Sequence, residues 1–330
     1  MLKYHQIENI PKIDTHVNLR MDELARTQTN DSNDIYRLVS KYCEKAVKSN
    51  VVVSELVYTP EVYTVPMKDG LSAVVNAAKE CSNNNFHINL SIQFLRDEPE
   101  EKALERFDIL REWLKWNRGV SYFITGITIG SFWNHMEVEK YSTFLKRTKE
   151  LLPDVGLSVN LELNPRTKLD IQQLINFSQV HNIEFRKFII NGFGKNTYES
   201  TLLDDEQFIS MIFANQIPVV ISPRNDTNLI TGLSEQLTYI KKWLDKGYRI
   251  VLNSDDYFKE DNVYGDFNSI LEQTFTLYDK DYWARNEYPY WNKDHIIGFM
   301  KTAQSCSYNR HYNVSNLFDK YQEILNDPNF

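Results

Sequence analysis

The feature that most constrains the fold is an alternation of short apolar segments with longer amphipathic ones along most of the chain. Eight apolar segments have the length and β-branched content of buried strands, and they span residues 12–17, 51–58, 86–94, 122–129, 156–161, 186–190, 217–221 and 249–253. Segments with helical spacing lie between most of them, at residues 34–49, 71–83, 98–117, 138–152, 169–181, 204–215 and 234–244. Repeated strand–helix units satisfy the right-handed crossover rule most simply as a closed parallel barrel, so we predict a TIM-type (β/α)8 barrel of the α/β class.

The chain length is compatible with a single domain. Its 330 residues are 42% hydrophobic, so we expect one large core over residues 1–330. The first connection, residues 19–50, is longer than a crossover helix needs, and we expect a helical lid there. Residues 262–330 are predicted to form a C-terminal helical extension rich in Tyr, Trp and Phe. Such aromatics favour core packing, with a homo-oligomer or protein-partner contact as the alternative.

Charge and cysteine content restrict the partners and the compartment. The net charge is −8, and no clustered basic stripe is present, so a nucleic-acid partner is not expected. No apolar run reaches membrane-spanning length, and residues 1–5 lack the apolar core of a signal peptide, so no membrane association is expected. Cys43, Cys81 and Cys306 are odd in number and widely separated in sequence, which fits a reducing cytoplasm better than a disulfide framework or a zinc knot.

Polar residues follow nearly every predicted strand. In a parallel barrel the catalytic groups lie at the carboxyl ends of the strands. The eighth strand ends in the adjacent carboxylates Asp255 and Asp256, whose repulsion is tolerated where a metal, a substrate amine or a hydrogen-bond network offsets it. The alternative is a helix N-cap. Other candidates from the strand ends are His16, Asn18, Arg20, Glu55, Gly130, Asn160, Glu162 and Asn191.

These strand ends resemble the adenosine deaminase family of the amidohydrolase superfamily in order and spacing. Residues 11–20, PKIDTHVNLR, resemble the family's first-strand motif PKx[ED]xHxHL[DE]G, and residues 253–257, NSDDY, resemble its eighth-strand motif [NS][ST]DDP. Partial matches lie at residues 53–60 (VSELVYTP), 126–130 (GITIG) and 222–232 (SPRNDTNLITG). The likeness extends over residues 9–260 and implies the same barrel.

The resemblance implies a zinc site that this chain matches in part. The family holds zinc with two His of strand one, one His of strand five and the first Asp of strand eight, and the second Asp contacts the purine. His16 and Asp255 fall on ligand positions and Asp256 on the purine-contacting position. Asn18 stands at the second His of strand one and Asn160 at the His of strand five.

The catalytic positions of the family are also changed. Asn191 stands where a His of strand six orients the attacking hydroxide, and Glu162 lies one residue before the position of the proton-donating Glu. Asparagine has no imidazole lone pair and no useful basicity. Zinc prefers nitrogen and sulfur donors, while an oxygen-rich set would suit magnesium or calcium only weakly. We therefore expect no cofactor. Zinc or another divalent metal would be bound only if other residues supplied the missing ligands.

The substituted pocket is still suited to a planar polar ligand. Asparagine amides can pair with an adenine edge, so a purine nucleoside or nucleotide is the expected small-molecule partner. Arg20 replaces an acid that faces the ribose 5′-hydroxyl in the family. A guanidinium prefers a phosphate, although an ion pair with Asp22 or Glu23 is the alternative. Gly130 and His135, at and after the end of strand four, are further candidate ligand contacts.

Three functions follow from these residues. The favoured one is a purine-binding pseudoenzyme, sensor or partner subunit that does not deaminate. The second is an active metal-dependent deaminase of adenosine, adenine or AMP, or a related hydrolase, that retains a metal through His16 and Asp255. The third is a metal-independent enzyme that uses Glu162 or Asp255 as a general acid or base on a purine nucleoside. Fold alone does not choose among them.

Overall fold

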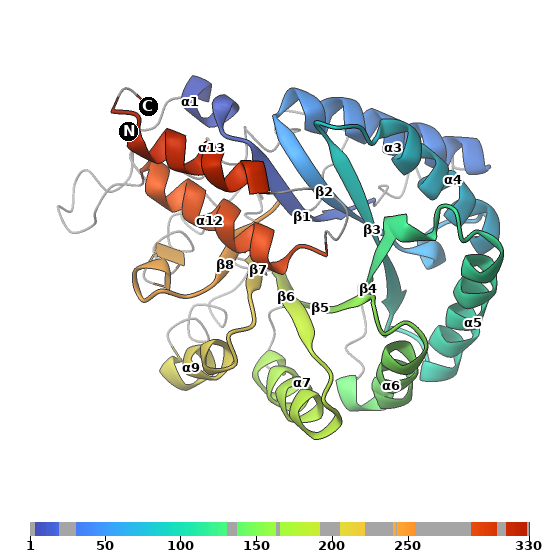
Figure 1. Ribbon diagram of the computed structural model, residues 1–330. Helices are drawn as coiled ribbons and strands as arrows, with labels where there is room; N and C mark the ends of the chain where they lie inside the picture. Colours follow the sequence, from blue (N-terminus) through green and yellow to red (C-terminus); the bar gives the residue numbers. More distant parts are fainter. Residues whose placement is uncertain are drawn as a thin grey trace, which may run out of the picture.

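The computed structural model describes residues 4–19, 31–130, 137–162, 166–191, 205–221, 240–241, 243–254, 292–308, 315–328 and 330. Eight parallel strands form one sheet in sequence order around a central axis (Figure 1). They are β1 Lys12–Asn18, β2 Val51–Tyr58, β3 His87–Leu95, β4 Ile124–Gly130, β5 Gly156–Glu162, β6 Phe185–Asn191, β7 Val219–Ile221 and β8 Ile250–Leu252. The predicted (β/α)8 barrel is confirmed.

Helices surround the strands and cover the outside of the barrel (Figure 1). They are α1 Tyr4–Asn9, α3 Ser32–Lys48, α4 Met67–Cys81, α5 Glu100–Trp116, α6 Ser142–Leu151, α7 Thr167–His181, α9 Glu206–Ala214, α12 Lys293–Cys306 and α13 Ser315–Asn326, with short 3-10 turns at Pro60–Val62, Ser121–Phe123 and Val138–Tyr141. Helix α12 packs against both β8 and β1, and the chain termini lie close together beside α13 (Figure 1).

Helix α3 lies in the first connection, and helices α12 and α13 lie in the C-terminal region. Helix α3 begins at a capping box in which Asp31 accepts from the backbone of Asn33 and Asp34, an arrangement that satisfies backbone donors left free in the first turn. Residues 20–30 and 255–291 lie outside the described residues, so the lid over residues 19–50 and the full extent of the extension stay predictions. Within the described part, no helix is long and apolar enough to span a membrane.

Polar side chains join β8 to β1, where the barrel closes. The Asn253 Nδ2 atom donates to the His16 carbonyl oxygen at 2.9 Å. The backbone nitrogen of Ser254 donates to the Asp14 carboxylate at 3.2 Å, and the Ser254 hydroxyl donates to the same carboxylate. The closure therefore holds the Asp14 side chain and the His16 backbone against Asn253 and Ser254.

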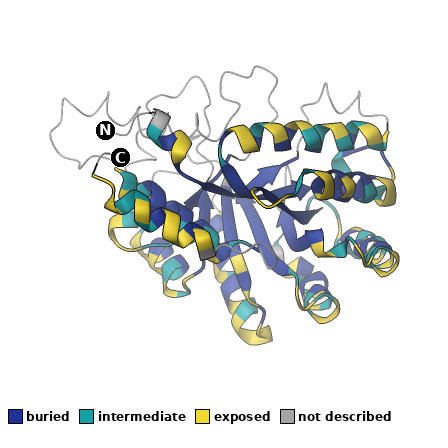
Figure 2. Ribbon diagram, turned by 45° about the horizontal axis from the view of Figure 1, so that its top comes forward, coloured by how far each residue is buried: buried dark blue, intermediate teal, exposed yellow. Residues whose placement is uncertain are grey.

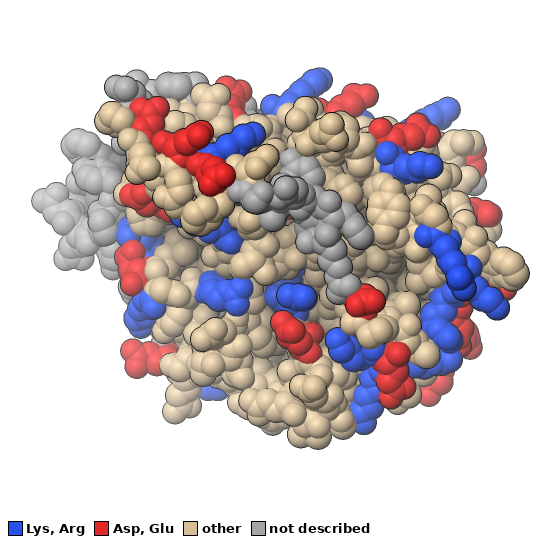
Figure 3. Space-filling view, in the orientation of Figure 1, with Lys and Arg blue, Asp and Glu red and all other residues tan. Residues whose placement is uncertain are grey.

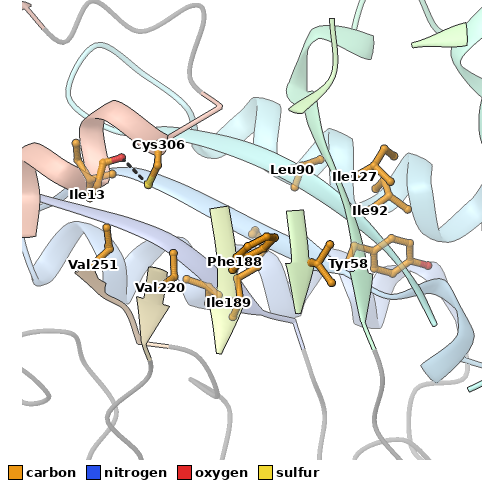
Figure 4. Close-up of a cluster of buried hydrophobic side chains, with 14 of the residues drawn as sticks. Ile13, Tyr58, Leu90, Ile92, Ile127, Phe188, Ile189, Val220, Val251 and Cys306 are labelled. Carbon is orange, nitrogen blue, oxygen red and sulfur yellow. Dashed lines mark hydrogen bonds between the residues drawn. The ribbon is translucent and has the colours of Figure 1, made fainter. Parts of the chain in front are cut away.

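The hydrophobic core lies between the sheet and the helices. Every residue of β1, β2, β3 and β4 is buried, and exposed side chains are confined mainly to the outer faces of the helices (Figure 2). The cluster in Figure 4 joins side chains of β1, β2, β3, β4, β6, β7 and β8 with Cys306 of α12. Each fully buried aliphatic or aromatic side chain contributes roughly 1.5–3 kcal/mol to folding.

A segment after α12 fills the inside of the barrel near the strand N-termini. The Tyr308 ring lies against Gly126 of β4 and Gly156 of β5. A Cβ atom would come within 2.4 Å of this ring at Gly126 and within 2.2 Å at Gly156. Glycine is required at both positions because the backbone and the ring approach too closely for any side chain.

Candidate functional site at the carboxyl ends of the strands

Strand β1 carries the first group of candidate residues. The register of β1 against β2 shifts by one residue between Asp14 and Val17, so simple strand alternation does not place Asp14, His16 and Asn18 on one face. His16 is 1% exposed and Asn18, at the carboxyl end, is 8% exposed. Both side chains are buried, and the placement of His16 and Asn18 on one face at the barrel mouth stays a prediction.

Burial favours the neutral forms of two ionisable groups of β1, Asp14 and His16. Burial lowers the pKa of His16 to about 3, and the positive charge of Lys187 lowers it further. Burial raises the pKa of Asp14 to about 7, while hydrogen bonds from Ser254 and the charge of Lys187 oppose that shift. The His16 imidazole is thus unprotonated at physiological pH, which is the form that coordinates a metal or accepts a hydrogen bond.

A buried ion pair lies deeper in the barrel. Lys187 of β6 donates to the Glu55 carboxylate of β2 and to the Thr15 carbonyl oxygen, and its Nζ atom lies 4.5 Å from the centroid of the Tyr308 ring. Glu55 also accepts from the Ser307 hydroxyl at 2.8 Å and from the backbone nitrogen of Tyr308. Glu55 therefore has a basic partner in the barrel interior and contacts the segment that follows α12.

Sequence reasoning missed Lys187. Strand alternation could have indicated it, because Lys187 shares its face of β6 with the candidate residue Asn191. Tyr308 carried no comparable signal, since its place depends on how the C-terminal segment packs.

The inner faces of β3, β4 and β5 carry small polar groups. The hydroxyls of Ser91, Thr128 and Ser158 form a continuous row, with oxygen–oxygen distances of 2.7 and 2.8 Å. At Gly130 a Cβ atom would lie 2.6 Å from the Gln93 side chain. The structure thus explains Gly130 by close packing, and its assignment as a ligand contact stays a prediction.

The carboxyl end of β5 positions Asn160. This residue shares its strand face with Gly156, which lies against Tyr308, and with Ser158, which bonds Thr128. Asn160 is 7% exposed, so its amide belongs to the inner wall at the mouth. The backbones of Glu162 and Asn191 are neighbours in the β5–β6 register. This pairing brings two candidate catalytic positions together, and the structure describes only their backbone.

The remaining candidates lie outside the described residues. These are Arg20, His135, Asp255 and Asp256. Asp255 directly follows Ser254, whose side chain bonds Asp14. The roles of these four residues stay predictions.

The described side chains do not fit a tetrahedral zinc site. The resemblance implies three histidine positions on β1 and β5. His16 provides an imidazole at one of them, whereas Asn18 and Asn160 provide amides at the other two. Within the described residues, no group of three or more His, Cys, Asp or Glu could hold one metal ion, and Asp255 falls outside that set. Amide oxygens are poor zinc donors, so we derive no catalytic step through a metal.

Comparison with known proteins shows that the chain is similar in sequence to purine deaminases. No family model matches the chain. An adenine deaminase of Ralstonia pickettii (strain 12J) is 24% identical over 68% of this chain and 60% of that protein. An adenosine deaminase of Clostridium kluyveri is 23% identical over 88% of this chain and 75% of that protein. The chain is adenosine-deaminase-like. The resemblance predicted from the strand-end motifs is confirmed.

Solved structures support the same fold. The adenine deaminase of Arthrobacter aurescens superposes with a TM-score of 0.69 at 15% identity, covering 96% of this chain and 100% of that chain. The N6-methyl-AMP deaminase of Arabidopsis thaliana gives a TM-score of 0.67 at 13% identity, covering 99% and 100%. The adenosine-deaminase-like chain spans 60% of the length of the Ralstonia pickettii relative.

Proposed function

We propose that this adenosine-deaminase-like protein binds a purine nucleoside or nucleotide at the barrel mouth without deaminating it through a zinc-bound hydroxide. It would act as a sensor, a regulator or a partner subunit. One observation carries the proposal: Asn18 and Asn160 are buried at strand ends where the resemblance calls for imidazoles. Purine binding is supported by relatives named as adenine and adenosine deaminases and by structures of Arabidopsis ADAL complexed with IMP and GMP.

Ligand binding by the two amides follows from their chemistry. Each asparagine presents one acceptor oxygen and two donor hydrogens in a plane, and a purine edge presents donors and acceptors in a plane as well. Asn18 and Asn160 are 8% and 7% exposed, so a ligand would contact them away from bulk water, where hydrogen bonds discriminate most strongly.

The proposed absence of zinc-dependent hydrolysis follows from the same replacement of imidazoles by amides. A hydroxide at neutral pH requires a metal that lowers the pKa of bound water to near 7. His16 and Asp255 alone would leave zinc with too few nitrogen donors. At the strand-six position, Asn191 has no basicity with which to orient a nucleophile.

Metal content, ammonia release and ligand binding test the proposal together. The protein would be purified without chelators, its metal measured by elemental analysis, and adenosine, adenine and AMP supplied as substrates. We expect negligible zinc, no ammonia above background and a rise in melting temperature with at least one purine. Ammonia release at a rate typical of enzymes would refute the proposal.

A restoration variant makes the test specific to the asparagines. In Asn18→His/Asn160→His, two imidazoles join His16 and Asp255, so we expect zinc to approach one equivalent. Asn18→Gln/Asn160→Gln is the matched control, since it keeps the amides and should bind no more zinc than the wild type. Equal zinc contents in all three proteins would show that the asparagines do not determine metal binding.

A metal-dependent deaminase with atypical ligands is the second candidate. The observation that favours it is the buried, unprotonated His16 imidazole. It requires stoichiometric metal in the wild-type protein and loss of ammonia release in Asp255→Ala.

A further inference from the structure

Strand β3 presents polar side chains on one face and apolar side chains on the other. Phe94 lies against Phe144 of α6, with ring centroids 4.9 Å apart, so Phe94 faces the outer helices. Side chains alternate along a strand, and the register shift between β3 and β4 places its extra residue in β4. Asn89, Ser91 and Gln93 therefore point together into the barrel.

The three polar side chains lie at different depths in the barrel. Asn89 pairs in register with Glu55, whose carboxylate contacts the segment after α12 near the strand N-termini. Ser91 belongs to the row of hydroxyls that continues onto β4. Gln93 lies two residues further toward the carboxyl end of β3, so it is the member of this set nearest the mouth.

The ends of two neighbouring strands hold the Gln93 amide in place. Its Nε2 atom donates to the hydroxyl of Thr59, the residue directly after β2, at 3.2 Å. On the other side lies Gly130, the last residue of β4. A Cβ atom at Gly130 would come within 2.6 Å of the Gln93 Cδ atom and 2.7 Å of its Oε1 atom. The missing side chain at Gly130 therefore makes room for the amide.

The Gln93 carbonyl oxygen has no protein partner. The side chain is 0% exposed, and within the described part of the chain no donor bonds its Oε1 atom. Nearly all buried polar atoms in proteins are paired, because an unpaired carbonyl oxygen has lost its water without gaining another donor. A donor from outside the chain would remove this penalty, at the end of the barrel where ligands bind.

Gln93 also adjoins a proposed ligand contact. Ile129 of β4 pairs with Val159 of β5, so Gly130 and Asn160 come next in register. The amides of Gln93 and Asn160 thus lie on either side of a glycine that separates them with no side chain of its own. A planar ligand at Asn160 would have the Gln93 oxygen as its neighbour across β4.

We propose that Gln93 determines ligand specificity by accepting a hydrogen bond from an N–H or O–H donor of the bound purine nucleoside. The inference rests on the proposed function, since it requires a purine at the mouth. With Nε2 bonded to Thr59, the oxygen is the amide atom left for the ligand, and a carbonyl oxygen only accepts. An analogue without that donor would leave the oxygen unpaired, and sites built in this way reject such analogues.

A panel of purine nucleosides, titrated by calorimetry into the wild-type full-length chain and Gln93→Met, tests the inference. Purine riboside lacks the 6-amino group of adenosine, and 2′-, 3′- and 5′-deoxyadenosine each lack one hydroxyl. We expect one analogue to bind the wild type about five- to tenfold more weakly than adenosine. Gln93→Met keeps the length of the side chain without the acceptor, so it should weaken adenosine by the same factor and leave that analogue unchanged. The analogue identifies the donor.

Two further variants separate recognition from folding. Asn89→Leu is the matched control, since it removes an equally buried amide from the same face of β3 at a deeper level, and it should keep the wild-type affinities. Gln93→Glu retains an acceptor oxygen and should retain the discrimination. Thermal unfolding without ligand checks that each variant is folded, and the wild-type panel stands without any variant.

The outcomes distinguish this inference from the proposed function. A wild-type protein that binds every purine of the panel equally would overturn the role of Gln93. Equal weakening of all purines by Gln93→Met, or no weakening, would overturn it as well, and the latter is the result expected if an ordered water is the only partner of Oε1. A wild-type protein that binds no purine would overturn the proposed function together with it.

Discussion

Glu55 and Lys187 are oppositely charged side chains that the barrel buries almost completely, at 1% and 2% exposure. Each charge is offset by the other and by further partners: the Thr15 carbonyl and the Tyr308 ring for Lys187, and the Ser307 hydroxyl for Glu55. Desolvation makes such a pair costly to form and still more costly to break on one side.

Breaking this pair tests its role. Lys187→Met leaves the Glu55 carboxylate buried without its cation and should lower the free energy of unfolding by about 3–5 kcal/mol. The double variant Lys187→Met/Glu55→Gln should recover part of that loss, because no charge remains unpaired. Chemical denaturation measures both, and a double variant no more stable than Lys187→Met would argue against the pairing.

Glu61 should make stability depend on pH. Burial raises the pKa of its carboxyl above the usual value, against the opposing charge of Arg106. A carboxyl whose folded-state pKa is raised favours the folded state when protonated, so its contribution is present below the unfolded pKa and lost as pH rises through the folded one. Glu61→Gln should flatten the stability profile above pH ~4.3. An unchanged slope in denaturation measured from acid to neutral pH would contradict this.

At the scale of elements, the sequence predicted strand positions well where an apolar segment has clear polar ends. Residues 51–58 were predicted and observed as β2. The fourth strand begins at Ile124 and not at 122, because residues 121–123 form a 3-10 turn. Helix α1 was missed because six residues are too few for a periodic signal. The motif placed Asn18 and Asn160 near their strand ends, whereas the Tyr308 packing depends on tertiary structure that local patterns do not encode.

The segment after α12 predicts a position-specific glycine effect. Gly156→Ala would press a methyl group against the Tyr308 ring, so we expect a loss of about 1–3 kcal/mol of stability. Gly298→Ala in α12 is the control, since no atom lies within 4 Å of a Cβ there, and helix propensity should make it neutral or stabilising by about 0.5–1 kcal/mol. Equal effects of both changes on thermal unfolding would show that Tyr308 does not restrict Gly156.

At the scale of the whole molecule, the two ends of the barrel carry different groups. The Tyr308 segment occupies the end near the strand N-termini, while Asn18 and Asn160 lie at the carboxyl ends, where barrel proteins place their ligands. On the face in Figure 3, Lys and Arg are interspersed with Asp and Glu without forming a continuous basic surface. We therefore place the proposed ligand site at the mouth of a barrel whose fold is shared with purine deaminases.

The central claim is that amides replace the imidazoles needed to hold a catalytic zinc. Its most direct test is elemental analysis of wild-type and Asn18→His/Asn160→His proteins, prepared side by side without chelators and loaded with equal zinc. We predict negligible zinc in the wild type and close to one equivalent in the variant. A full equivalent of tightly held zinc in the wild-type protein would contradict the account.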